Sequence, residues 1–435
     1  MHRRAFLKSL AASATASAFP QILRAETLGL GSATSPSNRL AVGLIGCGGQ
    51  GRSDITPVLA SPRARLVALC DPDDDMAARA LATVKKTYGP ASTCFTTRDF
   101  RELLARPGID AVIIATPDHW HCLAAVAAAR AGRHIYCEKP AATSIPEGRA
   151  MLDAITRAGV TCQIGSQQRS SAEFQRAIDL ARAGFLGKIT SVKVGLPRDT
   201  QQRPQSPPPP RPDPIPPSFD YNLWLGPGEN LPYFKHRCHF HWRWSYALAG
   251  GQVTDWIGHH YDIAALALNI TRRQPVAIRN ATATFIDDSP LYNTARDYSF
   301  EAHYAGGAII DVSSAHPDGL RLEGSEGWVH VRRGKIEHSR EALRHLAIPA
   351  HARLFPNGPK GHIDQFIDAA LTGAAPRCPI DEAHNIATVA HLANAAFRSG
   401  LPNLPWNPST ELPLNAPAAT PFLSKTYRPP WTFPA

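Results

Sequence analysis

Between residues 40 and 165, short apolar segments of strand length alternate with segments whose apolar residues recur at helical spacing. Segment 110–115 is apolar after Asp110 and rich in β-branched residues, as expected of a strand covered by helices on both faces. The alternation predicts a parallel, doubly wound sheet. The predicted strands are 40–45, 64–70, 94–95, 110–115, 134–137 and 161–165, and the predicted helices are 52–59, 77–88, 99–105, 121–131 and 146–158.

The pattern changes after residue 170. Segments 276–286, 297–304, 308–315 and 320–331 are strand-like and separated by turn residues, which predicts an antiparallel sheet. Helices are predicted at 173–183, 252–268, 361–371 and 381–399, with a further strand at 188–196. The chain is therefore expected to be α/β overall, with an N-terminal doubly wound domain (39–170) and a C-terminal α+β domain (171–405) built on a large, mostly antiparallel sheet. A tail (406–435) completes the chain.

Proline interrupts the C-terminal domain at residues 197–217, a stretch that contains ten prolines, including four in a row. Such a segment excludes helix and central strand and predicts an extended surface loop. Two interpretations stay open: a plain surface insertion, or an arm that covers the active site or docks a partner.

The composition excludes some classes of protein and favours others. The 435 residues suffice for two domains, and no run of 18 apolar residues predicts a membrane span. The net charge of +10 comes from scattered Lys and Arg without a basic block, so nucleic-acid binding is not indicated. The eight cysteines form no CxxC pair and are typical of small buried residues.

Residues 1–38 resemble an export signal and linker. Arg3-Arg4 opens a twin-arginine motif, followed by a modestly apolar, Ala-rich segment and small residues suited to cleavage. This route exports folded proteins, often with a cofactor inside, so the expected location is the periplasm. A nucleotide cofactor would then have to be regenerated in place.

The first strand runs into Gly46-x-Gly48-x-x-Gly51, and a second strand ends at Asp71. In a dinucleotide-binding turn the glycines allow a tight bend, close approach of a pyrophosphate and helix–strand packing. The free N–H groups of the following helix face the phosphates. A carboxylate at Asp71 accepts both hydroxyls of an adenosine ribose and repels a 2′-phosphate, which favours NAD over NADP. The alternative is an ordinary strand–turn–helix without a ligand.

Asp255, His259 and Asp262 are predicted on one stripe of a helix. An Asp–His pair four residues apart can act as a positioned general base. Lys139, at the end of a parallel strand, is suited to stabilise a substrate alkoxide. Two alternatives stay open: a satisfied core histidine, and a zinc or manganese site that also uses His236, His239 and His241. We expect no metal.

Taken together, the glycine-rich strand, Thr116-Pro117-Asp118, Glu138-Lys139-Pro140 and Gly250-Gly251-x3-Asp255-x3-His259-x2-Asp262 resemble the Gfo/Idh/MocA oxidoreductases, which include glucose–fructose oxidoreductase and inositol dehydrogenase. The resemblance covers about residues 40–405. It implies that the N-terminal domain is a Rossmann domain and that the C-terminal α/β domain has an open sheet. It implies catalytic positions for Lys139, Asp255 and His259, with His259 as the acid/base. It implies substrate-binding positions for Arg169, Arg243, His260 and Asp262. The implied NAD-binding set is Gly46, Gly48, Gly49, Gln50, Gly51, Asp71, Thr116, Pro117, His121, Glu138, Lys139 and Gln167.

The resulting functional hypothesis is an NAD-dependent oxidoreductase that acts on a sugar, polyol or glycoside, with tightly bound nicotinamide. One alternative is a redox-neutral, NAD-dependent glycoside hydrolase or lyase, and another is a non-catalytic sugar-binding relative. The expected partners are a small carbohydrate substrate and further copies of the chain, in a dimer or tetramer formed through the C-terminal sheet. Neither nucleic acid nor membrane is expected as a partner.

Overall fold

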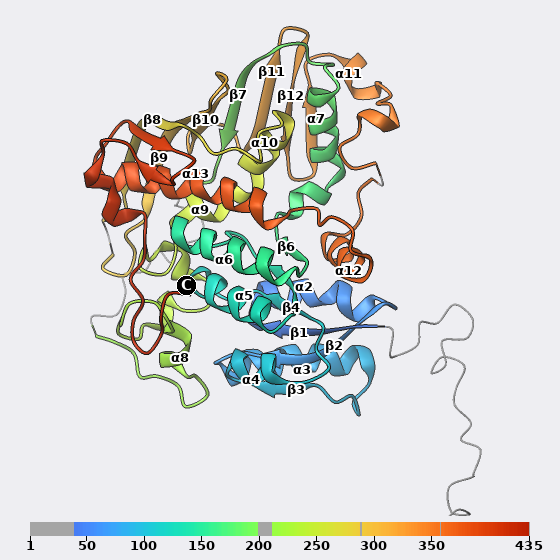
Figure 1. Ribbon diagram of the computed structural model, residues 1–435, viewed down its shortest axis with the longest axis vertical. Coiled ribbons are helices and arrows are strands. Elements are labelled where there is room, and N and C mark those ends of the chain that lie inside the picture. The colour runs from blue at the N-terminus through green and yellow to red at the C-terminus, as the bar shows by residue number, and fades with distance from the viewer. Residues whose placement is uncertain (1–38, 199–210, 288, 357, 435) are drawn as a thin grey trace, which may run out of the picture. The chain divides into compact units, whose positions relative to one another are not determined.

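The computed structural model describes residues 39–198, 211–287, 289–356 and 358–434. The predicted export signal and most of the proline-rich insert lie outside these residues. The described chain forms a compact unit that begins at Leu40 (Figure 1).

A six-stranded sheet in the order β3-β2-β1-β4-β5-β6 forms the first half, and all of its strand pairs are parallel. Helices pack on both faces, as the mostly apolar strands predicted. The order reverses between β1 and β4, the position where doubly wound sheets open a crevice at the carboxyl ends of their strands. The elements of this first half are β1 (Leu40–Ile45), α2 (Gly49–Ala60), β2 (Ala64–Cys70), α3 (Asp74–Tyr88), β3 (Phe95–Thr97), α4 (Phe100–Ala105), β4 (Ala111–Ile114), α5 (His121–Arg130), β5 (His134–Cys137), α6 (Ile145–Ala158) and β6 (Cys162–Ile164).

The second sheet has nine strands in the order β13-β12-β11-β7-β10-β9-β8-β14-β15, with only β7 and β10 paired in parallel among the described strands. One face is covered by α7, α10 and α13, whose apolar side chains form the largest core (Figure 1). The elements are α7 (Ala172–Arg182), β7 (Ile189–Gly195), α8 (Tyr221–Leu225), α9 (Gly251–Trp256), α10 (Asp262–Ala267), β8 (Ala277–Phe285), β9 (Ala295–His303), β10 (Ile309–Ser313), β11 (Gly319–Gly324), β12 (Gly327–Arg332), β13 (Lys335–His338), α11 (Glu341–His345), α12 (His362–Thr372), α13 (Ile380–Ser399), β14 (Leu404–Asn407) and β15 (Leu412–Pro413).

Two predicted elements are wrong in detail. The single strand expected at 320–331 is the hairpin β11–β12, because Ser325 and Glu326 form a tight turn. The single helix expected at 252–268 is α9 and α10 joined by a π-helical segment, Ile257–Tyr261, which contains His259. A π-helical turn holds more residues than an α-helical turn, so side chains four apart no longer lie above one another.

The order of elements along the chain does not separate the two halves completely. Helix α12 comes after the second sheet in sequence, yet its Ile363, Phe366 and Ile367 pack in the core formed by β1 and α2 of the first sheet. This return of the chain ties the two halves together.

Candidate active site

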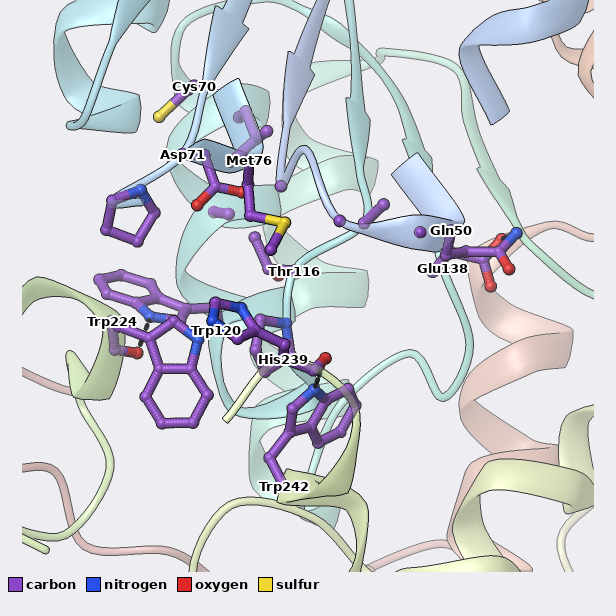
Figure 2. Close-up of a pocket in the computed structure, with 18 of the residues that line it drawn as sticks. Gln50, Cys70, Asp71, Met76, Thr116, Trp120, Glu138, Trp224, His239 and Trp242 are labelled. Atoms are coloured by element: carbon purple, nitrogen blue, oxygen red, sulfur yellow. Dashed lines mark hydrogen bonds between the residues drawn. The ribbon is translucent and has the colours of Figure 1, made fainter. Parts of the chain in front are cut away.

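A cavity of about 470 Å³ opens at the carboxyl ends of the parallel strands. Nine of the twelve residues predicted to bind the cofactor line it: Gly46, Gly48, Gly49, Gln50, Asp71, Thr116, Pro117, Glu138 and Lys139. Figure 2 shows how residues of the turn after β1 and of the strand ends surround this space. The sheet topology has therefore brought together motifs that are distant in the sequence, such as those of Gln50 and Glu138, which lie 88 residues apart.

The glycine-rich turn has the shape that a dinucleotide needs. Gly46 has φ of 93°, and a Cβ there would lie 2.6 Å from the Ala115 backbone. A Cβ on Gly51 would collide with the Gly46 carbonyl oxygen, so this glycine allows α2 to pack on the turn. Gly48 and Gly49 have no described atom within 4 Å of an added Cβ, which leaves open space over the backbone at the start of α2. The turn thus fits a pyrophosphate at a helix N-terminus.

Asp71 lines the cavity at the end of β2, as expected. Its two carboxylate oxygens accept hydrogen bonds from the backbone N–H groups of Cys47 (2.7 Å) and Asp73 (2.9 Å). Burial raises the pKa of this carboxyl to about 7, although the two hydrogen bonds oppose the shift. These bonds hold Asp71 in one orientation beside the glycine-rich turn.

Three predicted cofactor residues do not line the cavity. Gly51 packs beneath the turn. His121 is buried, and its ring nitrogens lie 2.7 Å from the Pro140 carbonyl oxygen and 3.1 Å from that of Thr116, so it bridges the two loops. Gln167 donates a hydrogen bond to Glu138 (3.0 Å) and supports that carboxylate from behind.

Asp54, which the sequence pattern did not indicate, belongs to the same cluster as Glu138. The Gln50 amide donates to Asp54 (2.8 Å) and lies 3.5 Å from a Glu138 oxygen. Both carboxyls are buried, and burial raises the pKa of each, with Glu138 raising that of Asp54 further. Nothing in the sequence signals Asp54 except its position one helical turn after Gln50.

Lys139, Asp255 and Arg243 form an ion-pair chain at the edge of the cavity. The Lys139 ammonium lies 2.7 Å from an Asp255 carboxylate oxygen, and Arg243 lies 3.4 Å from the same oxygen. Burial alone would raise the pKa of Asp255, but the two cations outweigh it and lower that pKa. Asp255 is therefore a carboxylate that holds two cations together.

His259 lies next to this chain and is 5% exposed. Its pKa is lowered well below 6.5, first by burial and then by the neighbouring cations Lys139 and Arg333. The Nδ1 atom has no hydrogen-bond partner among the described residues. The expected orientation of His259 by a hydrogen bond to Asp255 is not observed in the described residues, where the Asp255 carboxylate bonds to Lys139 and His259 belongs to the π-helical segment. The imidazole is neutral at pH 7.

The residues expected to bind substrate divide into two groups. Arg243 lines the cavity. Arg169 and Asp262 instead form a buried, bidentate ion pair (2.7 and 2.6 Å), and Arg169 also contacts Glu382 (2.7 Å). His260 is buried between Gln168 and Asp318, each 3.2 Å from a ring nitrogen. With their polar atoms already paired, Arg169, His260 and Asp262 are placed to support the site from behind.

An aromatic wall closes the other side of the cavity. Trp120, Trp224 and Trp242 line it together with His239 (Figure 2). The Trp120 indole donates to the Trp224 carbonyl oxygen (2.9 Å). No local motif of the sequence places this aromatic stretch against the cofactor site, because only the fold brings residues 219–246 next to the end of β2.

The metal alternative has no support in the described residues, where no three His, Cys, Asp or Glu side chains gather as a metal site. All eight cysteines are free thiols, and seven of them are buried. Within the part of the chain that the structure describes, no helix is both long and apolar enough to cross a bilayer.

Two family descriptions match the sequence. "Oxidoreductase family, NAD-binding Rossmann fold" covers residues 40–166, and "Oxidoreductase family, C-terminal alpha/beta domain" covers residues 209–433. The chain belongs to the Gfo/Idh/MocA family. Its six-stranded domain is therefore an NAD-binding Rossmann domain, as the glycine-rich turn predicted.

Similar proteins within the family have names that refer to carbohydrates. A glycosyl hydrolase family 109 protein of Shewanella putrefaciens is 29% identical over 43% of this chain and 44% of its own length. A levoglucosan dehydrogenase of Pseudarthrobacter phenanthrenivorans is 32% identical over 39% and 43%. The chain thus spans less than half the length of these relatives. A solved levoglucosan dehydrogenase, in complex with NADH and L-sorbose, has the same fold, with a TM-score of 0.63, 21% identity, and coverage of 85% of this chain and 99% of that one.

Proposed function

We propose that the protein is an NAD-dependent oxidoreductase that acts on a CH–OH group of a sugar, polyol or glycoside. The observation that carries the proposal is the position of a neutral, buried His259 beside the Lys139–Asp255 ion pair, in which Lys139 lines the same cavity as the glycine-rich turn. A base and a cation beside an NAD site are what the oxidation of an alcohol requires. The names of the similar proteins support a carbohydrate as substrate.

Each residue of the site has a separate task in this reaction. NAD, when bound, supplies the acceptor for the hydride that leaves the substrate carbon. His259 takes the hydroxyl proton, which a neutral imidazole can do at pH 7. The Lys139 ammonium stabilises the negative charge that develops on the substrate oxygen. Asp255 holds Lys139 and Arg243 in place, which replaces the orienting role toward His259 expected from the sequence.

A second candidate is a redox-neutral cycle, in which a sugar carbon is oxidised, a neighbouring glycosidic bond is broken, and the hydride is then returned. The similarity to a glycosyl hydrolase family 109 protein favours this candidate. The two candidates differ in their products, which are an oxidised sugar for the first and a cleaved glycoside for the second.

We also propose the setting in which the enzyme works. The twin-arginine motif at Arg3-Arg4 supports export to the periplasm after folding, with NAD already bound. We propose a Rossmann domain at 39–170 and a substrate domain at 171–405. The half-exposed, polar face of the nine-stranded sheet, which includes Asp297, Ser299 and Glu301 of β9, is the proposed surface for forming a homo-oligomer.

The test combines cofactor content, turnover and product analysis. Purified protein is incubated with a panel of sugars and glycosides while nicotinamide absorbance is followed and products are identified by mass spectrometry. The variant His259→Asn should lower turnover at least about 100-fold while NAD content stays the same. The matched control is His345→Asn, which changes an exposed histidine and should leave turnover unchanged. Equal turnover of His259→Asn and the wild type would contradict the assigned base.

A further inference from the structure

The chain ends in a segment, residues 425–433, that returns from the second half of the molecule to the aromatic wall of the cofactor cavity. We call this segment the C-terminal strap. Within it, Trp431 packs edge-on against Trp120 with ring centroids 4.8 Å apart, and the Arg101 guanidinium of α4 lies over the Trp431 ring at 5.0 Å. The strap therefore contacts a residue that lines the cavity without lining the cavity itself.

Trp120 is held from several directions. Its indole N–H donates to the Trp224 carbonyl oxygen, and Phe100 packs edge-on at 5.4 Å. Gly226 lies so close that a Cβ there would collide with the Trp120 ring. Trp431 covers Trp120 from the strap side. The position of this wall residue therefore depends on both the loop after α8 and the strap.

Arg428 fixes that loop to the strap. Its guanidinium donates to the Gly226 carbonyl oxygen (3.1 Å) and to the carbonyl (2.9 Å) and amide (2.7 Å) oxygens of Asn222. Its backbone N–H donates to the Pro227 carbonyl oxygen (3.0 Å). Helix α8 is short, and the N–H of its C-cap residue Gly226 already donates to the Asn222 carbonyl oxygen (3.1 Å), so Arg428 adds a second hydrogen bond to that oxygen and reaches the Gly226 carbonyl and Asn222 amide oxygens beside it. A planar guanidinium with several donors is well suited to satisfy them together.

The lobe formed by residues 218–246 is also joined to the adenosine side of the cavity. The Asp74 N–H donates to the Ser218 carbonyl oxygen (2.9 Å), and the Asp220 N–H donates to the Pro72 carbonyl oxygen (2.9 Å). These two hydrogen bonds attach the lobe to the residues that directly follow Asp71 in the chain. The lobe is thus anchored on one side by the loop after β2 and on the other side by the strap.

We propose that Arg428 and Trp431 are positioning residues that hold the aromatic wall, through Trp120 and the loop after α8, against the bound dinucleotide and so slow the release of NAD. The inference rests on the proposed function only in that NAD occupies the cavity. Slow release is what an enzyme needs if it takes a hydride and returns it to a second molecule or to the same one, because the reduced cofactor must remain bound between the two steps.

The test measures the rate at which NADH leaves the holoprotein, by following the loss of indole-to-nicotinamide energy transfer after addition of excess NAD. Trp431→Ala should raise the dissociation rate at least tenfold, and Arg428→Ala should do the same. Trp431→Phe keeps a ring against Trp120 and should stay within about threefold of the wild type. The matched control is Phe433→Ala, since Phe433 is 41% exposed and its ring packs against Tyr427 within the strap.

A second measurement uses the wild-type holoprotein, so that it does not depend on how the variants fold. If strap and cofactor are coupled, linkage requires that NADH slow the detachment of the strap. Cleavage within residues 425–433 by a protease should therefore become slower as NADH is added. Dissociation rates unchanged by Trp431→Ala, or strap cleavage unaffected by NADH, would overturn the inference while the proposed function stands. A protein that binds no NADH would overturn both.

Discussion

The role of Asp262 provides the sharpest test of the site. In the structure its carboxylate is paired with Arg169, whose side chain is 1% exposed, through hydrogen bonds of 2.7 and 2.6 Å. In Asp262→Asn the amide group would turn one donor toward the guanidinium and remove the balancing charge. Breaking a buried ion pair costs about 3–5 kcal/mol. Glu382 still contacts Arg169 at 2.7 Å, so we expect a cost near the lower end, about 3 kcal/mol.

A loss of this size should lower the melting temperature by at least about 6 °C, since each kcal/mol corresponds to about 2–4 °C in domains of 150–250 residues. The matched control is Asp381→Asn, which breaks a half-exposed pair with Arg272 and should shift melting by less than about 2 °C. The assay is thermal unfolding followed by circular dichroism, together with KM for the sugar. A variant that melts like the wild type but raises KM at least tenfold would show that Asp262 binds substrate and that its assigned structural role is wrong.

Three further predictions concern the cofactor turn, acid stability and the carboxyl cluster. Gly48→Ala should fold normally but weaken NADH binding at least tenfold, because the new Cβ enters the open space over the turn. Gly51→Ala should instead lower the melting temperature, because its Cβ collides with the Gly46 carbonyl oxygen. Calorimetry and thermal unfolding distinguish the two effects, and equal behaviour of the two variants would contradict the assignment. The free energy of unfolding should fall as the pH drops below 6.5, because the unfolded chain gains protons there while four buried histidines in the folded protein stay neutral: His119, His121, His362 and His391. Burial lowers the pKa values of these histidines to about 4 or about 3, and each contributes a slope of about 1.4 kcal/mol per pH unit. Denaturant unfolding at pH 7 and pH 5 measures this difference, and equal stability at both would count against it. The affinity of Asp54→Asn for NADH should stay within about threefold of that of the wild type, since burial raises the pKa of Asp54 and the amide resembles a protonated carboxyl. A tenfold loss of affinity, about 1.4 kcal/mol, would mean that Asp54 is ionised.

Several predictions came directly from local pattern. The mostly apolar segments, the helical spacing between them and Gly46-x-Gly48-x-x-Gly51 sufficed for the six-stranded parallel sheet and its NAD-binding turn. These features arise from rules that act over a few residues: strands buried on both faces are apolar throughout, and a tight turn after a strand requires glycine. Asp71 could be placed for the same reason, because the end of the second strand lies next to the first.

Other features depended on contacts between distant parts of the chain. The sequence shows Asp255 and His259 four apart, which in an α-helix would place them on one stripe, but Lys139 from the other half of the molecule bonds to the Asp255 carboxylate and His259 lies in a π-helical segment. Whether Arg169 faces substrate or another carboxylate is likewise decided by Asp262, 93 residues away.

By itself, then, the sequence determined the Rossmann architecture, the cofactor class and the chemical identity of the acid/base candidates, because each is encoded in short-range spacing. Only the tertiary structure decided which charges pair, which polar groups are consumed in the interior, and that residues 219–246, backed by the C-terminal strap, form a wall of the cavity. Those outcomes depend on burial and on the partners that burial selects. A side chain does not carry that information until the fold surrounds it.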